Sequence, residues 1–594
     1  MLNVHYQKRK NTELFKSLEN SIFLHLSNAQ NYIPIYKKFF CLNDTNYNSI
    51  NLNNKWYISS INEQNEFDYH IYNCKIKNSL NNKVKEKDIF FKLAPLLDPY
   101  KYLIGKYNIN DEKIFTLPKL NYTENECHPK LIDENNSAYV DGLFLYLSSN
   151  LISNHNFIHG VEYYGSFLGI KNQFIINIFD DIDYLNNSEF FIKNKNILFK
   201  VDDYEHLFKN EKKPLNPITI QHNISANSQL SFTSFNNELF SNIFNENDDK
   251  NKIDEKDSNE LIDIIDINFL ERDKNAHVTL KSNSTCSSRS SYTDNSSIEE
   301  ECDNCNLLEE EDESKMEDNN SKSYNDDLEE ESNSSDSEVE ERIDAIIPKF
   351  PIQVISMEYC ENTLDDLILN EELSNEEWYS TFMQIIMILL TYQKAFHFTH
   401  NDLHTNNVMY NSTDKKYIFY CYKKKYYKVP TFGRIFKIID FGRSIYKFDG
   451  KLFCSDSFQI GGDAATQYNT EPYLNEKKPR LEPNFSFDLC RLACSIFDYV
   501  IDDFEEIKDI SKCKDPIKRL IVEWCIDDKG INMLYKNNGS DRYPDFKLYK
   551  MIARCVHNHT PQAQLERPEF DAFSQFKGEV SHDVIDIDKI LCYI

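Results

Sequence analysis

The sequence of 594 residues carries a formal net charge of −30, with 40% hydrophobic and 13% aromatic residues, which is enough apolar material for a sizeable core and more than one domain. Half of the net charge lies in residues 301–340, where 17 side chains are acidic and 2 are basic. The remainder lacks the clustered basic residues of a nucleic-acid-binding protein, so we expect no nucleic-acid partner.

The sequence has no strong membrane or export signal. Its start, MLNVHYQKRK, is basic but is followed by no long apolar run, so we expect no secretory signal. The most apolar stretch, FMQIIMILL at 382–390, is too short to span a bilayer and is typical of a buried helix. The 15 cysteines are scattered, which favours reduced thiols. We therefore expect an intracellular protein without a membrane partner.

The N-terminal part of the sequence has the patterns of several strands and one helix. After an N-terminal extension of 1–49, three runs rich in β-branched and aromatic residues predict strands. They are WYISSI at 56–61, HIYNCKI at 70–76 and DIFFKLAPLL at 88–97. Apolar residues recur at helical spacing through 136–152, which predicts a helix, and IHGVEYYGSFLGI at 158–170 indicates a further strand.

The composition changes near residue 172. Residues 245–342 are dominated by Asn, Ser, Asp and Glu, and such a segment cannot bury enough apolar surface to offset the entropy lost on ordering. We therefore predict an insertion over 172–349 that is acidic and largely disordered. Regular patterning resumes at FPIQVISMEYC (350–360), and an apolar helix is predicted at 377–396.

Strand patterns early in the sequence and helical patterns late, through 485–594, predict an α+β fold with two lobes. The first lobe is β-rich and starts with residues 50–171. Residues 350–594 complete that lobe and form the second, helical one.

Two short stretches have the residue types that phosphoryl transfer needs. That reaction requires oxygen ligands for Mg²⁺ and a group that orients the attacking hydroxyl. In HNDLHTNN (400–407), Asp402 can accept the hydroxyl proton and Asn407 can turn its carbonyl to a metal ion. In KIIDFG (437–442), Asp440 ends a β-rich run and can reach the same metal ion. The pairing, order and separation of the two stretches favour a catalytic site over an asparagine-rich surface loop.

The motifs H-x-D-L-x-x-x-N and D-F-G resemble those of eukaryotic-type protein kinases, and the composition resembles the divergent Ser/Thr kinases of large DNA viruses. The resemblance covers roughly 50–172 and 350–575. It implies a protein-kinase-like fold, ATP and Mg²⁺ as cofactors, a protein substrate, and a place in the host cytoplasm or the virion. It also implies Asp402 as the catalytic base and Asn407 and Asp440 as metal ligands.

The resemblance extends to residues that bind the nucleotide or support the loop. Lys92 in IFFKLAP resembles the lysine that contacts the α- and β-phosphates. In VISMEYC, Met357 corresponds to the gatekeeper, and the backbone groups of Glu358 and Cys360 are implied to meet the adenine edge. Asp488 in NFSFDLCRLACSIF corresponds to the buried Asp that braces the catalytic loop, and RPEF (567–570) to the late Arg-Pro signature.

The sequence departs from the family at the nucleotide loop and at the partner of Lys92. Its first glycine is Gly105, which follows Lys92, so no glycine-rich loop precedes that lysine, and a hairpin such as NEQNEFD (62–68) is left to cover the nucleotide. The helix that should carry the glutamate partner of Lys92 has Asp141 instead. Asp141 either pairs with Lys92 after an inward shift of the helix or caps the helix or faces solvent.

Two departures near the catalytic loop bear on regulation and substrate. Asn401 replaces the arginine that reads a phosphate on the activation loop, which predicts activity without phosphorylation of the segment 443–475. That segment lacks Ala-Pro-Glu, and Glu471 is the nearest counterpart of its closing glutamate. His404 replaces a common lysine, as in haspin-like kinases and in small-molecule kinases of the aminoglycoside and choline type. The alternatives to a protein kinase are therefore a small-molecule kinase or a pseudokinase scaffold.

Two further motifs favour no additional function. CDNC at 302–305 has the spacing of a zinc half-site, but no second pair of ligands lies at a matching distance. KKKYYK at 423–428 lies where the kinase fold has a surface hairpin, and we expect a solvated turn.

Overall fold

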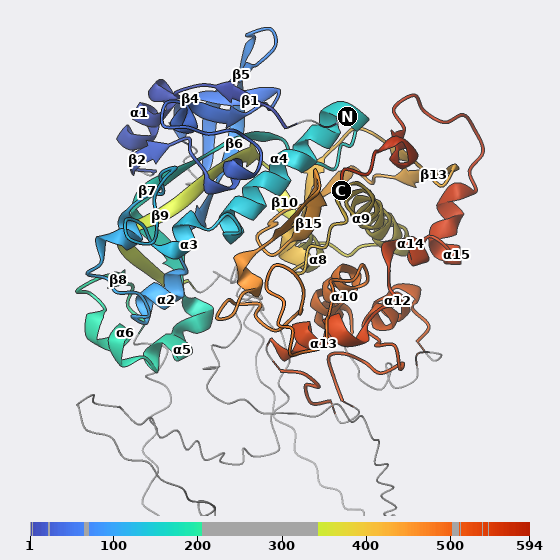
Figure 1. Ribbon diagram of the computed structural model, residues 1–594. Helices are drawn as coiled ribbons and strands as arrows, with labels where there is room; N and C mark the ends of the chain where they lie inside the picture. Colours follow the sequence, from blue (N-terminus) through green and yellow to red (C-terminus); the bar gives the residue numbers. More distant parts are fainter. Residues whose placement is uncertain are drawn as a thin grey trace, which may run out of the picture. The chain divides into compact units, whose positions relative to one another are not determined.

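The computed structural model is a mixed α+β structure in which strands dominate the N-terminal region and helices the C-terminal part (Figure 1). The structure describes residues 2, 4–21, 24–64, 70–204, 342–501, 510, 513–536, 539–544 and 546–594. The predicted disorder of 245–342, apart from Arg342, and the CDNC motif lie outside these residues. So does most of the hairpin tip predicted to cover a nucleotide.

One seven-stranded antiparallel sheet forms the core of the N-terminal region. Its strand order is β2-β7-β9-β6-β5-β4, and β8 pairs with β9. The strands are β2 (Leu26–Gln30), β4 (Trp56–Gln64), β5 (Ile71–Asn78), β6 (Val84–Pro95), β7 (Tyr163–Asn177), β8 (Lys200–Val201) and β9 (Asp344–Glu358). The strands predicted in 56–61, 70–76, 88–97 and 158–170 are confirmed.

The residues expected to form an N-terminal extension contribute to this region. Strand β1 (Tyr6–Lys8) pairs with β3 (Ile50–Leu52), and β2 joins the seven-stranded sheet through β7. Helix α1 (Thr12–Asn20) lies between β1 and β2. Residues 26–30, within the expected extension, are therefore part of the seven-stranded sheet.

Strands β7 and β9 are longer than their sequence patterns indicate. They pair from Tyr163 and Met357 to Asn177 and Asp344, so the expected boundaries at 171/172 and 349/350 fall inside paired strands. Each of the two strand ends, KNQFIIN at 171–177 and DAIIPK at 344–349, has only a short apolar run beside polar sequence. Their pairing with each other stabilises them beyond what the local pattern predicts. After β7 the chain forms α5 (Ile182–Asn186) and α6 (Glu189–Asn194).

Helix α4 (Ser137–His155) packs against β7 and β9 and confirms the helix predicted over 136–152 (Figure 1). Asn136 caps it by accepting a hydrogen bond from the N–H of Ala138. Its residues from Ala138 to Ser148 are all buried, including the polar Asp141. The short helices α2 (Pro99–Leu103) and α3 (Pro129–Ile132) precede α4.

The C-terminal part is built around α9 (Asn375–Phe396), which confirms the apolar helix predicted over 377–396. A capping box of Ser374 and Glu377 begins α9, and Trp524 on α12 contacts its Phe382. The other helices are α8 (Leu364–Asn370), α10 (Phe487–Val500), α12 (Pro516–Trp524), α13 (Lys547–Cys555), α14 (Pro561–Gln564) and α15 (Pro568–Asp571). Among the described residues, no helix is long and apolar enough to cross a membrane.

Three small sheets are formed mainly by strands that lie between α8 and α10 in sequence. β10 precedes α8, and β17 lies near the C-terminus. The first has the order β10-β11-β14, the second β13-β12-β17, and the third is the pair β15-β16. Their bounds are β10 (Asn362–Thr363), β11 (Val408–Ser412), β12 (Tyr417–Tyr422), β13 (Lys425–Pro430), β14 (Arg434–Ile438), β15 (Ile445–Phe448), β16 (Lys451–Cys454) and β17 (Ile585–Asp586). The loop 400–407 enters β11, and Asp440 follows β14.

Candidate functional site

The structure brings Lys92 together with two carboxylates from distant parts of the chain. The Nζ of Lys92, on β6, donates to Asp141 Oδ2 at 2.6 Å and to Asp440 Oδ1 at 2.8 Å. Burial lowers the pKa of Lys92, but Asp141 and Asp440 outweigh this and raise it above its ordinary value. Lys92 is therefore a fixed cation between α4 and the end of β14.

Asp141 is paired, which is one of the two interpretations that the sequence left open. Besides the ion pair with Lys92, its Oδ1 accepts a hydrogen bond from the backbone N–H of Phe441 at 3.0 Å. The next residue on α4 is Gly142, where a Cβ would lie 2.3 Å from Nε2 of Gln353 on β9. The absence of a Cβ lets α4 pack closely against β9, so the short aspartate reaches the lysine.

Asp440 is held with its side chain accessible. Its φ is +61°, a left-handed conformation at the end of β14, and the N–H of Gly442 donates to its Oδ1 at 3.4 Å. The Asp440 side chain is 48% exposed, so it can take a further ligand. Partial desolvation of the carboxyl raises its pKa, but Lys92 outweighs this effect and lowers the pKa below its ordinary value.

Asp488 fixes the backbone of the loop 400–407. The N–H groups of His400 and Asn401 each donate to the Asp488 carboxylate at 2.9 Å. Asp488 lies in the first turn of α10 and is completely buried, and burial raises its pKa. The contact agrees with the brace that the sequence led us to expect.

Asp402 is enclosed by groups that the sequence did not identify. Its Oδ1 accepts a hydrogen bond from Tyr549 Oη at 2.8 Å, and its Oδ2 lies 3.8 Å from Arg443 Nη1. The residue is 6% exposed. Burial raises the pKa of Asp402, but Arg443, His404 and Arg491 together lower it below its ordinary value. Asp402 is therefore an ionised carboxylate that already accepts a hydrogen bond from a hydroxyl.

Asn407 is oriented by the loop itself. Its Nδ2 donates to the backbone carbonyl of Asp402 at 2.9 Å and to His404 Nε2 at 3.0 Å. Burial lowers the pKa of His404 to about 4, so the ring is neutral near pH 7 and its Nε2 can accept. Both amide hydrogens are used within the loop, and the carbonyl oxygen is the atom that can bind a cation.

The three residues expected at the adenine edge lie at or just after the end of β9. Met357 is buried and pairs with Phe90 of β6. The carboxylate of Glu358 accepts hydrogen bonds from Lys437 and Asn411, so the side chain has a structural role. Cys360 is buried and follows the strand. Their adenine contacts remain a prediction.

The arginine of the late Arg-Pro signature pairs with an acidic residue of α12. Arg567 forms an ion pair with Glu523 on α12 and lies 3.9 Å from Glu569. Glu523 carries no local motif, so this ion pair was not predicted. Glu471, the nearest counterpart of the closing glutamate of the segment 443–475, is exposed.

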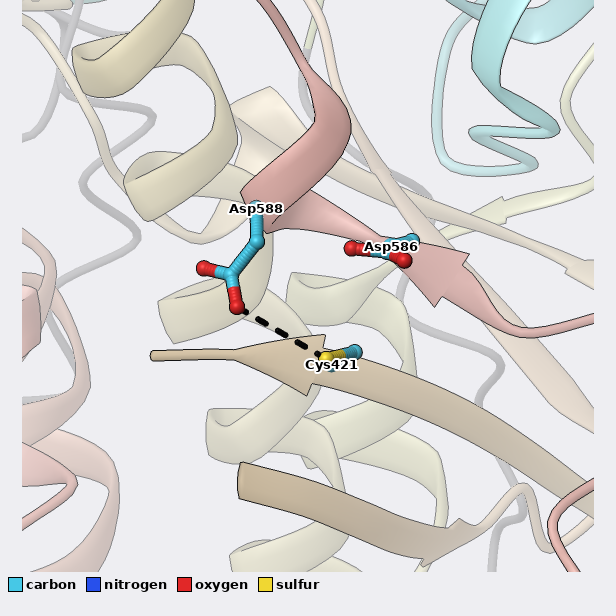
Figure 2. Close-up of side chains that lie close together, drawn as sticks. All are labelled: Cys421, Asp586 and Asp588. Carbon is cyan, nitrogen blue, oxygen red and sulfur yellow. Dashed lines mark hydrogen bonds between the residues drawn. The ribbon is translucent and has the colours of Figure 1, made fainter. Parts of the chain in front are cut away.

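The KKKYYK hairpin is fastened by a cluster at its base. Figure 2 shows Cys421 of β12 beside Asp586 and Asp588. The Cys421 Sγ and one carboxylate oxygen of each aspartate lie within 4.8 Å of one another. The Asp588 carboxylate accepts hydrogen bonds from the N–H groups of Lys423 and Lys424 at 2.8 and 2.7 Å. Both lysines have positive φ and are exposed. The cluster therefore holds a tight solvated turn, as expected of a surface hairpin.

Part of the chain is similar to a viral protein. No family model matches the chain. The chain is similar to "Uncharacterized protein 098R" of Invertebrate iridescent virus 6, with 29% identity over 183 residues. The match covers 30% of this chain and spans 26% of the length of that relative.

Proposed function

We propose that the chain is an ATP-dependent protein kinase that transfers the γ-phosphate to a Ser or Thr hydroxyl of a protein. The observation that carries the proposal is the contact of Lys92 with both Asp141 and Asp440. The loop that carries Asp402 and Asn407 lies beside it, since the N–H of Ile439 donates to the carbonyl of Asn407 at 3.0 Å. Lys92 and Asp440 are 348 residues apart in sequence, so their contact is made by the tertiary fold.

The residues present fit a Mg²⁺ ion and a nucleotide phosphate. Asp440 offers an accessible carboxylate and Asn407 a carbonyl oxygen, which are the hard ligands that Mg²⁺ prefers. A bound Mg²⁺ would neutralise charge on the phosphates. Lys92 would orient the α- and β-phosphates, and Asp141 holds its ammonium group in place.

Asp402 would orient the acceptor hydroxyl. Its lowered pKa keeps the carboxylate ionised near neutral pH, so it can accept a hydrogen bond. The bond that it accepts from Tyr549 Oη supports this role, because an acceptor hydroxyl would make the same bond. Asp488 fixes the backbone from which Asp402 projects.

The test is transfer of radiolabelled phosphate from ATP, with Mg²⁺, to a generic protein substrate. We expect Asp402→Asn to lower the rate by about a hundredfold or more, since the carboxylate can no longer act as a base. The control is Asp414→Asn, because Asp414 is exposed on the loop between β11 and β12. Equal rates in the wild type and Asp402→Asn would contradict the proposal.

Two alternatives are separated by further measurements. Transfer to an amino alcohol or a sugar but not to protein would identify a small-molecule kinase. A pseudokinase scaffold that has lost the nucleotide would show no rise in melting temperature with millimolar ATP and Mg²⁺, whereas a ligand that binds the native state raises it. For the proposed kinase, we expect ATP and Mg²⁺ to raise the melting temperature of the wild type but not that of Lys92→Met.

A further inference from the structure

A buried carboxylate joins the segment after Asp440 to the first turn of α4. Asp456 lies in the 3₁₀ helix Asp456–Phe458, just after β16, and is 0% exposed. Its Oδ2 accepts a hydrogen bond from Lys130 Nζ at 2.6 Å, and its Oδ1 accepts one from the N–H of Ser137 at 3.0 Å. Its own N–H donates to the carbonyl of Asn135 at 2.8 Å. Asp456 therefore contacts three residues at or before the start of α4.

The same turn is tied to the strand that carries Lys92. The Nδ2 of Asn136, the cap of α4, donates to the carbonyls of Leu96 and Lys130, each at 2.9 Å. Leu96 directly follows β6. Ser137 and Asp141 are four residues apart and lie on the same face of α4. The position of this first turn therefore sets where Asp141 meets Lys92.

The segment after Asp440 is also fixed to the catalytic loop by a neutral group. The Nδ2 of Asn401 donates to the carbonyl of Arg443 at 2.9 Å, and its Oδ1 accepts a hydrogen bond from Tyr468 Oη at 2.8 Å. Asn401, Arg443 and Tyr468 are all buried. This contact needs no phosphate, because Asn401 has an amide in place of the arginine that would bind one.

We propose that Asp456 is a positioning residue that holds α4, and through it Asp141, against Lys92, so that the site assembles without phosphorylation of the segment 443–475. The inference rests on the proposed kinase function. The negative charge that pairs with Lys130 is the Asp456 carboxylate, which is always present. A phosphate with the same role would have to be added by phosphorylation. Asp456 touches no reacting group and acts only through α4.

A matched control separates positioning from general stability. Asp527 is also buried and ion-paired, since its Oδ2 accepts a hydrogen bond from Arg542 Nη2 at 3.0 Å. Its Oδ1 accepts hydrogen bonds from the N–H groups of Lys529 and Ile531. Asp527 follows α12 and makes none of the α4 contacts described above. Asp527→Asn thus removes a comparable buried pair at another place.

The experiment compares Asp456→Asn, Lys130→Met and Asp527→Asn in the full chain, at a temperature where all are folded. We expect the first two variants to lower kcat by about tenfold or more, because a small misplacement of Lys92 or Asp141 is costly, with little change in KM for the protein substrate. Asp527→Asn should keep the wild-type kcat. Phosphatase treatment of the wild type should leave kcat unchanged. Equal kcat in Asp456→Asn and Asp527→Asn, or inactivation by phosphatase, would overturn the inference.

Hydrogen exchange makes the inference testable apart from catalysis. The amides of α4 should exchange about tenfold faster in Asp456→Asn and Lys130→Met than in the wild type, because local opening of the helix costs less. In Asp527→Asn they should exchange as in the wild type. If the wild type transfers no phosphate, the proposed function fails, while faster exchange in α4 still supports Asp456 as the residue that positions this helix. Unchanged exchange overturns that role whatever the activity.

Discussion

At the scale of single residues, the hydrogen bond between Tyr549 and Asp402 bears on the proposed transfer step. The Tyr549 hydroxyl donates to Asp402 Oδ1, an oxygen that the proposed acceptor hydroxyl could use. The ring of Tyr549 is fixed by packing, since it stacks on Phe546 at 5.2 Å and lies 4.9 Å from the guanidinium of Arg491. In the proposed kinase, this hydroxyl would compete with the acceptor for Asp402.

Removing this hydroxyl should speed transfer. Tyr549→Phe keeps the ring and its packing but removes the donor to Asp402. Because the competing hydrogen bond contributes about 1 kcal/mol net, we expect kcat/KM to rise about fivefold. Steady-state phosphorylation of a protein substrate measures this change.

Tyr535→Phe is the matched control for Tyr549→Phe. The Tyr535 hydroxyl also donates to a carboxylate, that of Asp498 at 2.7 Å, but it lies away from Asp402. We expect kcat/KM to be unchanged in this variant. A fall in kcat/KM for Tyr549→Phe would refute competition and would instead make the hydroxyl an aid to catalysis.

At the scale of elements, the distance between α4 and the sheet determines whether a short aspartate can pair with Lys92. Gly142 lies against Gln353 of β9, and a Cβ at this position would meet Gln353 Nε2 at 2.3 Å. Gln353 is 1% exposed, so its side chain has little room to move. A larger residue at 142 must push the helix away from β9 or displace Gln353.

Gly142→Ala should therefore reduce both stability and transfer. We expect a loss of about 1–3 kcal/mol in the free energy of unfolding, typical of overpacking, together with a lower kcat because Asp141 moves away from Lys92. Chemical denaturation and steady-state kinetics measure the two effects. In the double variant Gly142→Ala with Gln353→Ala, the space is restored, and kcat should recover relative to Gly142→Ala. If kcat does not recover, the role of Gly142 is not to let α4 approach β9.

At the scale of the whole molecule, local patterns predicted the elements better than the partners of the site residues. The strands in 56–97 and the two long helices follow from periodicity, and the loop 400–407 and Asp440 carry their motif within a few residues. Tyr549 is 147 residues from Asp402, and Asp456 is 326 from Lys130. Such contacts depend on tertiary packing of distant segments, which no local pattern records.

The ambiguity of Asp141 has the same cause. Its sequence neighbours allow an ion pair, a cap or a solvent-facing position, and only the packing of α4 on β9 decides among them. The ends of β7 and β9 were missed for a related reason, because each is stabilised by the other across a long segment. Predictions that depend on a single helix or strand were reliable. Contacts between two elements could be found only in the structure.

Two buried neutral histidines link the stability of the whole molecule to pH. His159 lies with its ring nitrogens 2.7 Å from the carbonyl of Phe436 and 2.6 Å from Tyr420 Oη. Burial lowers the pKa of His159 to about 3 and that of His404 to about 4, from an ordinary value of 6.5. At a pH below 6.5 but above these lowered pKa values, both histidines are protonated in the unfolded chain but not in the native protein. Acidification through this range therefore favours unfolding.

These two histidines together should lower the free energy of unfolding by about 3 kcal/mol between about pH 8 and about pH 5.5. Urea denaturation at the two pH values measures the loss. Replacing both residues by Gln removes the titrating groups, so the double variant should lose about 3 kcal/mol less than the wild type over the same interval. His582→Gln is the control, because His582 is exposed, and it should lose as much as the wild type. An equal loss in the double variant would show that other groups carry the pH dependence.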